Sequence, residues 1–390
     1  MTPTAVQFGA GSIGRGFIAQ LFHDGGLEVV FVDVLEAFVS AINARRSYTI
    51  RIVGPSAEDI EIGGVRAVNG RDAGRVAEEV ATCRVACTAV GAKALPQIAP
   101  TLAAGLLLRH RQGAEPLNIL VCENLHSAGA VLRGLVGRHL PAGERDAVLA
   151  EAGFVQAVVS RMVPLREGDN ASDPLLVRAE AYRRLPVDAA AVVGTLPDLP
   201  GVEPVADFPA HEARKLFVHN CAHAALGYLG WRRGILHGYE ALADPAIHSE
   251  VMAVLAETGE ALIRRFGLDR DEHRAHVADL LARFSNVALG DTCFRLARDP
   301  VRKLSPDDRL VGAARLCEQT GVAPNALARV VGAALRFDAA EDPVAVEMQR
   351  RIAAEGAPAV LRSVAGIAPD EPLGRAALAA YALLSAGAAG

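Results

Sequence analysis

The sequence AVQFGAGSIGRG at residues 5–16 decides the fold of the N-terminal half of the chain. Residues 4–8 are typical of a buried strand, and residues 13–24 have the apolar spacing of a helix. Gly9, Gly11 and Gly14 therefore occupy the turn between a strand and a helix. A strand, a glycine-rich turn and a helix in this order predict the phosphate-binding corner of a Rossmann-type domain.

Each glycine of this turn has its own task. Gly9 allows the tight turn, Gly11 lets a pyrophosphate approach the main chain, and Gly14 permits close packing of the helix on the strand. The free N–H groups at the helix start would then bind the phosphates. The predicted cofactor loop consists of Gly9, Ala10, Gly11, Ser12, Ile13 and Gly14. The alternative is a purely structural turn.

Asp33 makes the cofactor interpretation more specific. It ends the next expected strand, Glu28–Asp33, and lies 19 residues after Gly14. Its carboxylate can accept hydrogen bonds from both adenosine ribose hydroxyls and would repel a 2′-phosphate, which favours NAD over NADP. Arg45 and Arg46 could shift that preference, but they lie well past the end of the strand. The alternative for Asp33 is an ordinary strand terminator.

The rest of the chain shows two kinds of hydrophobic pattern, one before and one after about residue 211. Further strand patterns at Val85–Val90, Asn118–Cys122 and Phe154–Val159 alternate with helical patterns, which predicts parallel βαβ units. From His211 onward the apolar spacing is helical throughout, at 211–229, 245–266, 271–284, 308–319, 324–336, 343–355 and 374–386. We expect an α/β NAD-binding domain with a mostly parallel sheet over 1–195 and an all-α substrate-binding domain over 196–390. The proline-rich segment 187–210 is the expected linker.

Composition excludes several classes of protein. With 390 residues, 51% of them hydrophobic and 22% charged, the chain has enough apolar material for a core and is not disordered. A net charge of −5 gives no broad basic surface for nucleic acid. The six cysteines form no CxxC pair, so we expect buried free thiols in a reducing cytoplasm. Neither a secretory signal nor an apolar run long enough for a membrane helix is expected.

The stretch HEARKLFVHNCAHAALGYLG at 211–230 carries the polar residues of the second half. In a helix, Lys215, His219 and His223 lie four residues apart on one face, with Asn220 on its flank. His219 and His223 have the spacing of a zinc-binding helix. A zinc protease, however, needs glutamate where HNCAH has Asn220, and no third ligand is marked out by the sequence.

Metal-free hydride transfer is the competing interpretation of the same helix. A lysine in a partly apolar cleft has a lowered pKa and can act as a base near neutral pH. The Asn220 amide can donate a hydrogen bond to a developing alkoxide, and His223 can orient the substrate hydroxyl. The alternative is structural, with one lysine reaching to solvent and two histidines satisfied within the core.

The pattern Lys215-x4-Asn220-x2-His223 downstream of the glycine loop resembles the polyol-specific long-chain dehydrogenases and reductases, most closely their mannitol 1-phosphate branch. Matching blocks in the right order extend over nearly the whole chain. They are FGAGSIGRGFI at 8–18, NARRSY at 43–48, TAVG at 88–91, PLNILVCEN at 116–124, RKLFVHNCAH at 214–223 and PVRKLSPDDRL at 300–310.

This resemblance implies a metal-independent NAD enzyme with defined residue roles. Lys215 would be the general base, Asn220 and Asn124 the oxyanion-hole pair, and His223 the group that orients the hydroxyl. Ala89, Val90 and Gly91 would line the cofactor. One departure concerns Ser160 in VSRMVP, where close relatives carry aspartate, so the detailed mechanism or the substrate preference can differ here.

A basic cluster bears on the substrate. Arg302, Lys303 and Arg309 follow Arg283 and Arg295, and arginine is suited to bidentate phosphate binding. Composition alone favours a solvated, salt-bridged helix face, whereas the resemblance favours a phosphate site. The expected reaction interconverts D-mannitol 1-phosphate and D-fructose 6-phosphate with NAD, in a cleft between the two domains. A free-polyol or hexonate dehydrogenase and a catalytically silent NAD-binding sensor remain the alternatives, and the oligomeric state stays open.

Overall fold

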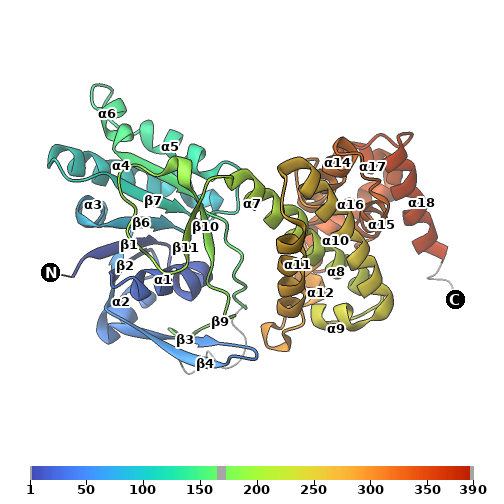
Figure 1. Cartoon of the computed structure of the whole chain (residues 1–390), viewed down its shortest axis with the longest axis horizontal. Coiled ribbons are helices and arrows are strands. Elements are labelled where there is room, and N and C mark those ends of the chain that lie inside the picture. The colour runs from blue at the N-terminus through green and yellow to red at the C-terminus, as the bar shows by residue number, and fades with distance from the viewer. Residues whose placement is uncertain (1, 165–172, 387–390) are drawn as a thin grey trace. The chain divides into compact units, whose positions relative to one another are not determined.

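The computed structural model describes residues 2–164 and 173–386. The chain forms two compact units, Met1–Phe208 and Pro209–Gly390. Strands are confined to the first unit among the described residues, and the second is built from helices (Figure 1). The fold class predicted from the sequence, a Rossmann-type α/β part followed by an all-α part, is confirmed.

A six-stranded sheet with all neighbours parallel forms the centre of the N-terminal unit. Its strand order is β5-β2-β1-β6-β7-β8, which is the 3-2-1-4-5-6 order of dinucleotide-binding sheets when these six strands are counted along the chain. The bounds are β1 Thr4–Phe8, β2 Glu28–Asp33, β5 Val65–Asn69, β6 Val85–Thr88, β7 Leu117–Val121 and β8 Ala152–Gln156. The first two have the predicted bounds, and the predicted later strands lie within a few residues of β6, β7 and β8.

Both faces of this sheet are covered by helices, as a parallel sheet requires. Alternate residues of β1 enter different cores: Ala5 packs with α1 and α2, whereas Val6 packs with α3, α4 and α5. The helices are α1 Ala19–Asp24, α2 Glu36–Arg45, α3 Ala73–Thr82, α4 Leu95–Arg111, α5 Ala128–Gly137 and α6 Arg145–Ala150, with 3-10 turns at Ala92–Ala94 and Ala189–Ala191. The helix predicted at Ile13–Asp24 begins as a π-helical turn, Gly14–Ile18, before α1.

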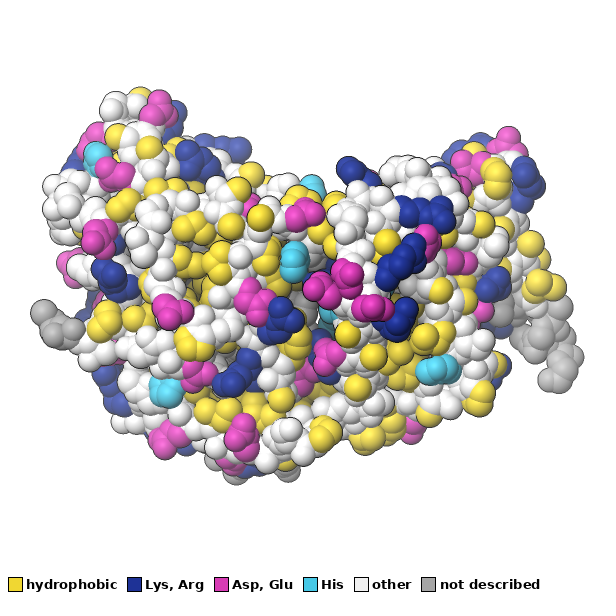
Figure 2. Space-filling view, in the orientation of Figure 1, with side chains coloured by type: hydrophobic (Ala, Val, Ile, Leu, Met, Phe, Trp, Pro, Cys, Tyr) yellow, Lys and Arg dark blue, Asp and Glu magenta, His cyan; other side chains and the backbone are white. Residues whose placement is uncertain are grey.

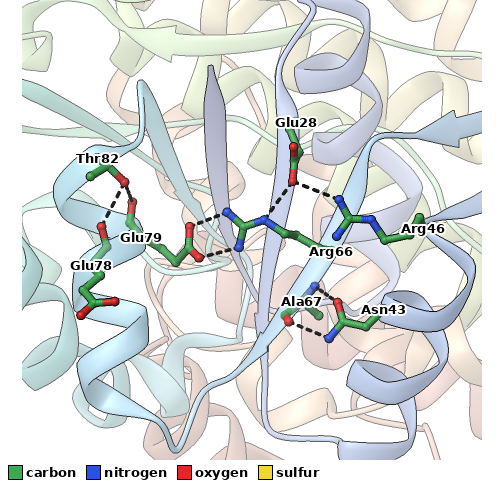
Figure 3. Close-up of polar contacts among 8 residues, drawn as sticks. All are labelled: Glu28, Asn43, Arg46, Arg66, Ala67, Glu78, Glu79 and Thr82. Atoms are coloured by element: carbon green, nitrogen blue, oxygen red, sulfur yellow. Dashed lines mark hydrogen bonds and ion pairs between the residues drawn. The ribbon is translucent and has the colours of Figure 1, made fainter. Parts of the chain in front are cut away.

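Polar contacts hold the edge strand β5 in place (Figure 3). The Arg66 guanidinium donates to both carboxylate oxygens of Glu79 on α3, at 2.5 and 2.7 Å, and to Glu28 on β2 at 2.8 Å. The Asn43 side chain on α2 exchanges two hydrogen bonds, of 2.8 and 2.9 Å, with the main chain of Ala67. The two hydrogen bonds of Asn43 use main-chain groups of Ala67 at the sheet edge that would otherwise be open to pairing with another chain.

Two smaller sheets flank the central one. One consists of β3 Ser47–Ile52, β4 Glu58–Gly63 and β9 Val177–Ala179, and the other of β10 Leu185–Asp188 and β11 Val202–Val205. The proline-rich segment 187–210, predicted as a linker, therefore contains a strand. Pro204 is compatible with that strand because a two-stranded sheet consists of edge strands.

The C-terminal unit is organised around α8, which packs against α9, α10, α12 and α15. The long predicted helices are present. The short α9, α12, α13 and α17 were not predicted, because a helix of one or two turns carries too little periodicity to be recognised. The bounds are α7 Phe208–Arg214, π-helical Lys215–Asn220, α8 Cys221–Arg232, α9 Gly238–Ala243, α10 Pro245–Phe266, α11 Arg270–Phe284, 3-10 Val287–Leu289, α12 Cys293–Ala297, α13 Pro300–Lys303, α14 Val311–Gln319, α15 Asn325–Ala334, α16 Pro343–Glu355, α17 Ala357–Ala365 and α18 Pro372–Ala386.

The cysteines and the surface charges agree with what the composition predicts. All six cysteines are buried free thiols, as predicted. Acidic and basic side chains are interspersed over the face shown in Figure 2. In the ranges that the structure describes, no helix has both the length and the apolar character needed to cross a membrane.

Candidate functional site

The glycine loop lies at the carboxyl end of β1, where ligands bind in parallel sheets. Gly9 has φ +87°, in the left-handed region that favours glycine, and its N–H donates to Val32 O at 2.9 Å. A methyl group on Gly14 would collide with the Gly9 carbonyl, so this glycine lets the helix approach the strand. A methyl group on Gly11 would meet no atom within 4 Å. The open side of the loop is therefore at Gly11 and Ser12, which are both exposed.

Asp33 is held against this loop from the neighbouring strand β2. Its Oδ2 accepts a hydrogen bond from Ala10 N at 2.8 Å, and its Oδ1 accepts one from Leu35 N at 3.0 Å. Each carboxylate oxygen has a second lone pair, so Asp33 retains acceptor capacity for two hydroxyl groups. The same side chain thus fixes the loop and remains able to bind a ribose.

A second loop, Thr88–Gly91, follows the next strand of the sheet. Ala89 N donates to Phe8 O at 2.9 Å, and the Ala89 carbonyl lies so close to Gly9 that a methyl group there would collide with it. Gly91 has φ +87°, which favours glycine. Asn124 is exposed just after β7. The residues predicted to line the cofactor therefore lie at the carboxyl ends of three neighbouring strands, β2, β1 and β6, and the predicted oxyanion-hole residue Asn124 follows the next strand, β7.

In the C-terminal unit, Lys215 begins a π-helical turn that ends at Asn220. Hydrogen bonds from i to i+5 bring residues five apart onto successive turns, whereas in an α-helix they would be rotated apart by roughly 140°. Lys215 and Asn220 are five residues apart. The π-helical turn thus brings Asn220 from the flank, where the sequence pattern had placed it, toward the face that carries Lys215.

The ammonium group of Lys215 is in a strongly perturbed environment. Burial lowers its pKa to about 7, and the positive charge of Arg309 acts in the same direction, while Asp308 partly opposes it. Although the residue as a whole keeps some exposed surface, its charged form is disfavoured. Near neutral pH this lysine is therefore present in both protonation states, as a proton-transfer group must be.

Two histidines and a phenylalanine pack next to this lysine. The His223 ring stacks on Phe284 of α11, with centroids 3.8 Å apart and 19° between the planes. His219 meets His223 edge to face at 4.9 Å. Burial and the nearby Lys215 hold the pKa values of both histidines well below the usual range. Both rings are thus neutral at pH 7, and the stack fixes the orientation of His223.

Asn220 carries a buried amide donor that the described residues do not use. The residue is 6% exposed, and its Nδ2 makes no hydrogen bond to any residue of the described ranges. Buried polar groups of this kind normally have a partner, because leaving one unpaired costs about 1–3 kcal/mol. A ligand oxygen is a suitable acceptor for this donor.

Arginines from a later part of the chain face the same helix. Arg309, Arg295 and Arg283 each act to lower the pKa of His223. The Arg309 side chain is 10% exposed and its Nε donates to Asp308 at 2.7 Å, while its Nη groups have no partner among the described residues. The positive charges of Arg283 on α11, Arg295 on α12 and Arg309 between α13 and α14 therefore act on His223, and that of Arg309 also acts on Lys215.

The three predicted phosphate residues differ from one another. Arg302 is half-exposed and forms ion pairs with Asp299 and Asp308. Lys303 is buried, and its ammonium donates to the carbonyls of Leu296 and Arg298 at 2.5 and 2.6 Å. Two of the three N–H groups of the Lys303 ammonium thus cap helix α12. Among Arg302, Lys303 and Arg309, the last is therefore best placed to bind an anion.

The structure adds two residues that the sequence did not single out. Phe284 stacks on His223, and Glu123 binds the main chain of the Thr88–Gly91 loop. Neither residue has a spacing signal in the sequence, because each makes its contact across the fold.

Ser160 lies in the irregular segment after β8. Within 2–164 and 173–386, no three His, Cys, Asp or Glu side chains are arranged to hold a metal ion.

These features define a class of protein with a Rossmann-type nucleotide-binding fold and a separate helical unit that carries a lysine of depressed pKa. Residues 3–201 match the mannitol dehydrogenase Rossmann domain and residues 207–364 the mannitol dehydrogenase C-terminal domain. The chain belongs to the mannitol dehydrogenase family. This membership confirms the resemblance inferred from the sequence.

Curated relatives align over nearly the full chain. The mannitol-1-phosphate 5-dehydrogenase of Bacillus velezensis is 39% identical over 373 residues, covering 95% of this chain and 97% of the relative. The enzyme of the same name from Bacillus subtilis is 38% identical over 370 residues, with coverage of 95% and 97%.

Solved structures share the fold at low identity. The Pseudomonas fluorescens mannitol 2-dehydrogenase, solved as a ternary complex with NAD and D-mannitol, has a TM-score of 0.79 at 19% identity, covering 99% of this chain and 92% of that one. A substrate-free D-sorbitol dehydrogenase has a TM-score of 0.80 at 16% identity, with coverage of 99% and 93%.

Proposed function

We propose that this chain is an NAD-dependent, metal-independent oxidoreductase that interconverts D-mannitol 1-phosphate and D-fructose 6-phosphate, with Lys215 as the general base. The observation that carries the proposal is the 36–39% identity, over 95–96% of the chain, to enzymes named mannitol-1-phosphate 5-dehydrogenase. We assign the reaction to the cytoplasm, because six buried free thiols suit a reducing compartment.

The N-terminal unit has the features that NAD requires. The exposed, unobstructed main chain at Gly11 suits the pyrophosphate, and the free acceptor capacity of Asp33 suits the ribose hydroxyls. Asp33 would repel a 2′-phosphate, which favours NAD over NADP. Bound NAD supplies the nicotinamide that exchanges a hydride with C5 of mannitol 1-phosphate, the carbon that becomes C2 of the ketose.

Lys215 and Asn220 of the π-helical turn, together with His223 and Asn124, would carry out the remaining chemistry. Neutral Lys215 takes the proton of the substrate hydroxyl in oxidation, and protonated Lys215 returns it in reduction. The Asn220 amide, whose Nδ2 has no partner in the part of the chain that the structure describes, donates to the oxygen as it gains negative charge, and Asn124 is proposed to donate a second hydrogen bond to the same oxygen. Neutral His223, held by Phe284, donates or accepts one hydrogen bond to orient the same hydroxyl.

The phosphate group distinguishes this substrate from a free polyol. The Nη groups of Arg309 have no partner within 2–164 and 173–386, and its charge acts on Lys215, which suits bidentate binding of a phosphomonoester near this lysine. Arg302 shares Asp308 with Arg309 and extends the positive charge toward solvent. Lys303, whose ammonium is engaged with two carbonyls, contributes charge rather than a direct contact.

The pH dependence of the reaction follows from the lysine. Because oxidation needs the deprotonated form, kcat/KM for mannitol 1-phosphate should rise tenfold per pH unit below about 7 and level off above it. Because reduction needs the protonated form, kcat/KM for fructose 6-phosphate should fall as pH rises above about 7. Initial rates in both directions between pH 5.5 and pH 9 test this, and equal profiles in the two directions would contradict the role of Lys215 as base.

The overall proposal is tested by the loss of NADH absorbance on adding fructose 6-phosphate, fructose or a ketohexonate. Turnover of the phosphorylated ketose, with NADPH a poor substitute for NADH, is the expected result. Turnover of fructose or the ketohexonate alone would place the protein among the free-polyol or hexonate dehydrogenases. NADH binding without turnover of any of the three would favour an NAD-binding sensor.

A further inference from the structure

Glu123 joins two loops at the ligand-binding edge of the central sheet. It follows β7 by two residues, and its carboxylate reaches across to the loop that follows β6. Oε1 accepts a hydrogen bond from Val90 N at 2.9 Å, and Oε2 accepts one from Gly91 N at 2.8 Å. Because these loops lie at the carboxyl ends of adjacent parallel strands, the contact is made where dinucleotides bind.

Burying a carboxylate at this position is costly unless it is well paired. Glu123 is 8% exposed. Two hydrogen bonds from successive main-chain N–H groups to the two oxygens are charge-assisted and therefore offset the loss of water. The negative charge also lies at the start of the helical segment that runs from Ala92 to Arg111, where it is favoured. A neutral side chain would satisfy these two N–H groups less well.

The loop depends on this carboxylate for its position. On one side, Ala89 N is bound to Phe8 O, and the Ala89 carbonyl lies against Gly9 of the glycine loop. On the other side, Val90 and Gly91 are held by Glu123. The Glu123 side chain therefore connects the Thr88–Gly91 loop to the segment after β7 that contains Asn124.

We infer that Glu123 is a positioning residue for the cofactor: its carboxylate sets the place of the Thr88–Gly91 loop and, through the chain, of Asn124. This inference rests on the proposed use of NAD. Since Glu123 consumes the N–H groups of Val90 and Gly91, it acts on the cofactor through the loop and not by direct contact. Its loss should weaken NADH binding and also lower turnover of the ketose.

The test compares Glu123→Gln with Glu257→Gln by titration of NADH fluorescence. Glu257 is a matched control, because its carboxylate accepts hydrogen bonds from the successive amides Ala326 N and Leu327 N at 2.7 and 3.0 Å, in the C-terminal unit. Glu123→Gln should raise the Kd for NADH by about 10-fold or more. Both substitutions should lower Tm by a similar amount, because each weakens two charge-assisted hydrogen bonds, but Glu257→Gln should leave the Kd for NADH within about twofold of wild type.

Two further measurements separate positioning from mere stability. Glu123→Asp keeps the charge but shortens the side chain, so it should fold and should weaken NADH binding less than glutamine does. In turnover, Glu123→Gln should raise KM for NADH and lower kcat, whereas a purely structural loss would change Tm alone. An unchanged Kd for NADH in both Glu123 variants, or an equal rise in Glu257→Gln, would overturn the inference. The titration needs no turnover, so wild-type protein that binds NADH but reduces no ketose would contradict the proposed function and not this inference.

Discussion

Replacing Lys215 by methionine is expected to lower kcat for both directions of the reaction by about 10³-fold, within the range of 10²–10⁴ typical of a general base. Methionine fills a similar volume in the buried environment of the lysine and removes only the titratable group. The Kd for NADH should stay close to that of wild type, because the cofactor features described above belong to the other unit. Stopped-flow measurement of NADH oxidation, together with a binding titration, checks both parts.

Lys215→Arg provides the matched control for charge. Arginine keeps a positive charge but does not deprotonate in proteins, so this variant should be nearly as inactive as the methionine variant. Small primary amines added to Lys215→Ala should restore part of the activity, with a pH dependence set by the pKa of the amine. Activity within tenfold of wild type in Lys215→Arg would assign the lysine an electrostatic role in place of proton transfer.

Arg309→Gln is expected to raise KM for fructose 6-phosphate by about 30-fold or more, because the proposed charge-assisted bidentate contact to phosphate would be lost. The pH-independent kcat/KM for unphosphorylated fructose should be unchanged, because this substrate has no phosphate to contact Arg309. A second effect follows from electrostatics. The charge of Arg309 lowers the pKa of Lys215, so its removal should move the inflection of the oxidation profile above pH 7.

Arg329→Gln is the control for this experiment. Arg329 is an arginine of the same unit that forms an ion pair with Glu250 at 2.6 Å, and it belongs to none of the proposed sites. It should leave KM and the pH profile unchanged. An equal loss for fructose and fructose 6-phosphate in Arg309→Gln would make the arginine cluster structural and would favour the free-polyol alternative.

The N-terminal half shows how far local pattern predicts structure. Gly9, Gly11, Gly14 and Asp33 lie within 25 residues of one another, and the strand–turn–helix unit follows from that spacing, whereas the hydrogen bond between Asp33 and Ala10 N was not predicted. The bounds of β1 and β2 were predicted because a buried parallel strand is a short apolar run closed by glycine or a polar residue. The split of the following helix into a π-helical turn and α1 has no such signal.

The C-terminal site required the tertiary structure. The sequence by itself determined that Lys215, His219 and His223 share a helix, because helical spacing depends only on positions along the chain. The π-helical turn that brings Asn220 toward Lys215, the stacking of Phe284 on His223, and the approach of Arg283, Arg295 and Arg309 were decided only by packing. The contacts of Phe284 and the three arginines join residues that are about 60–95 positions apart, and no local pattern specifies which side chains will meet when separate helices pack around α8. The pKa of Lys215, near 7, depends on the groups that surround the side chain. It is therefore a property of the fold and not of the sequence motif.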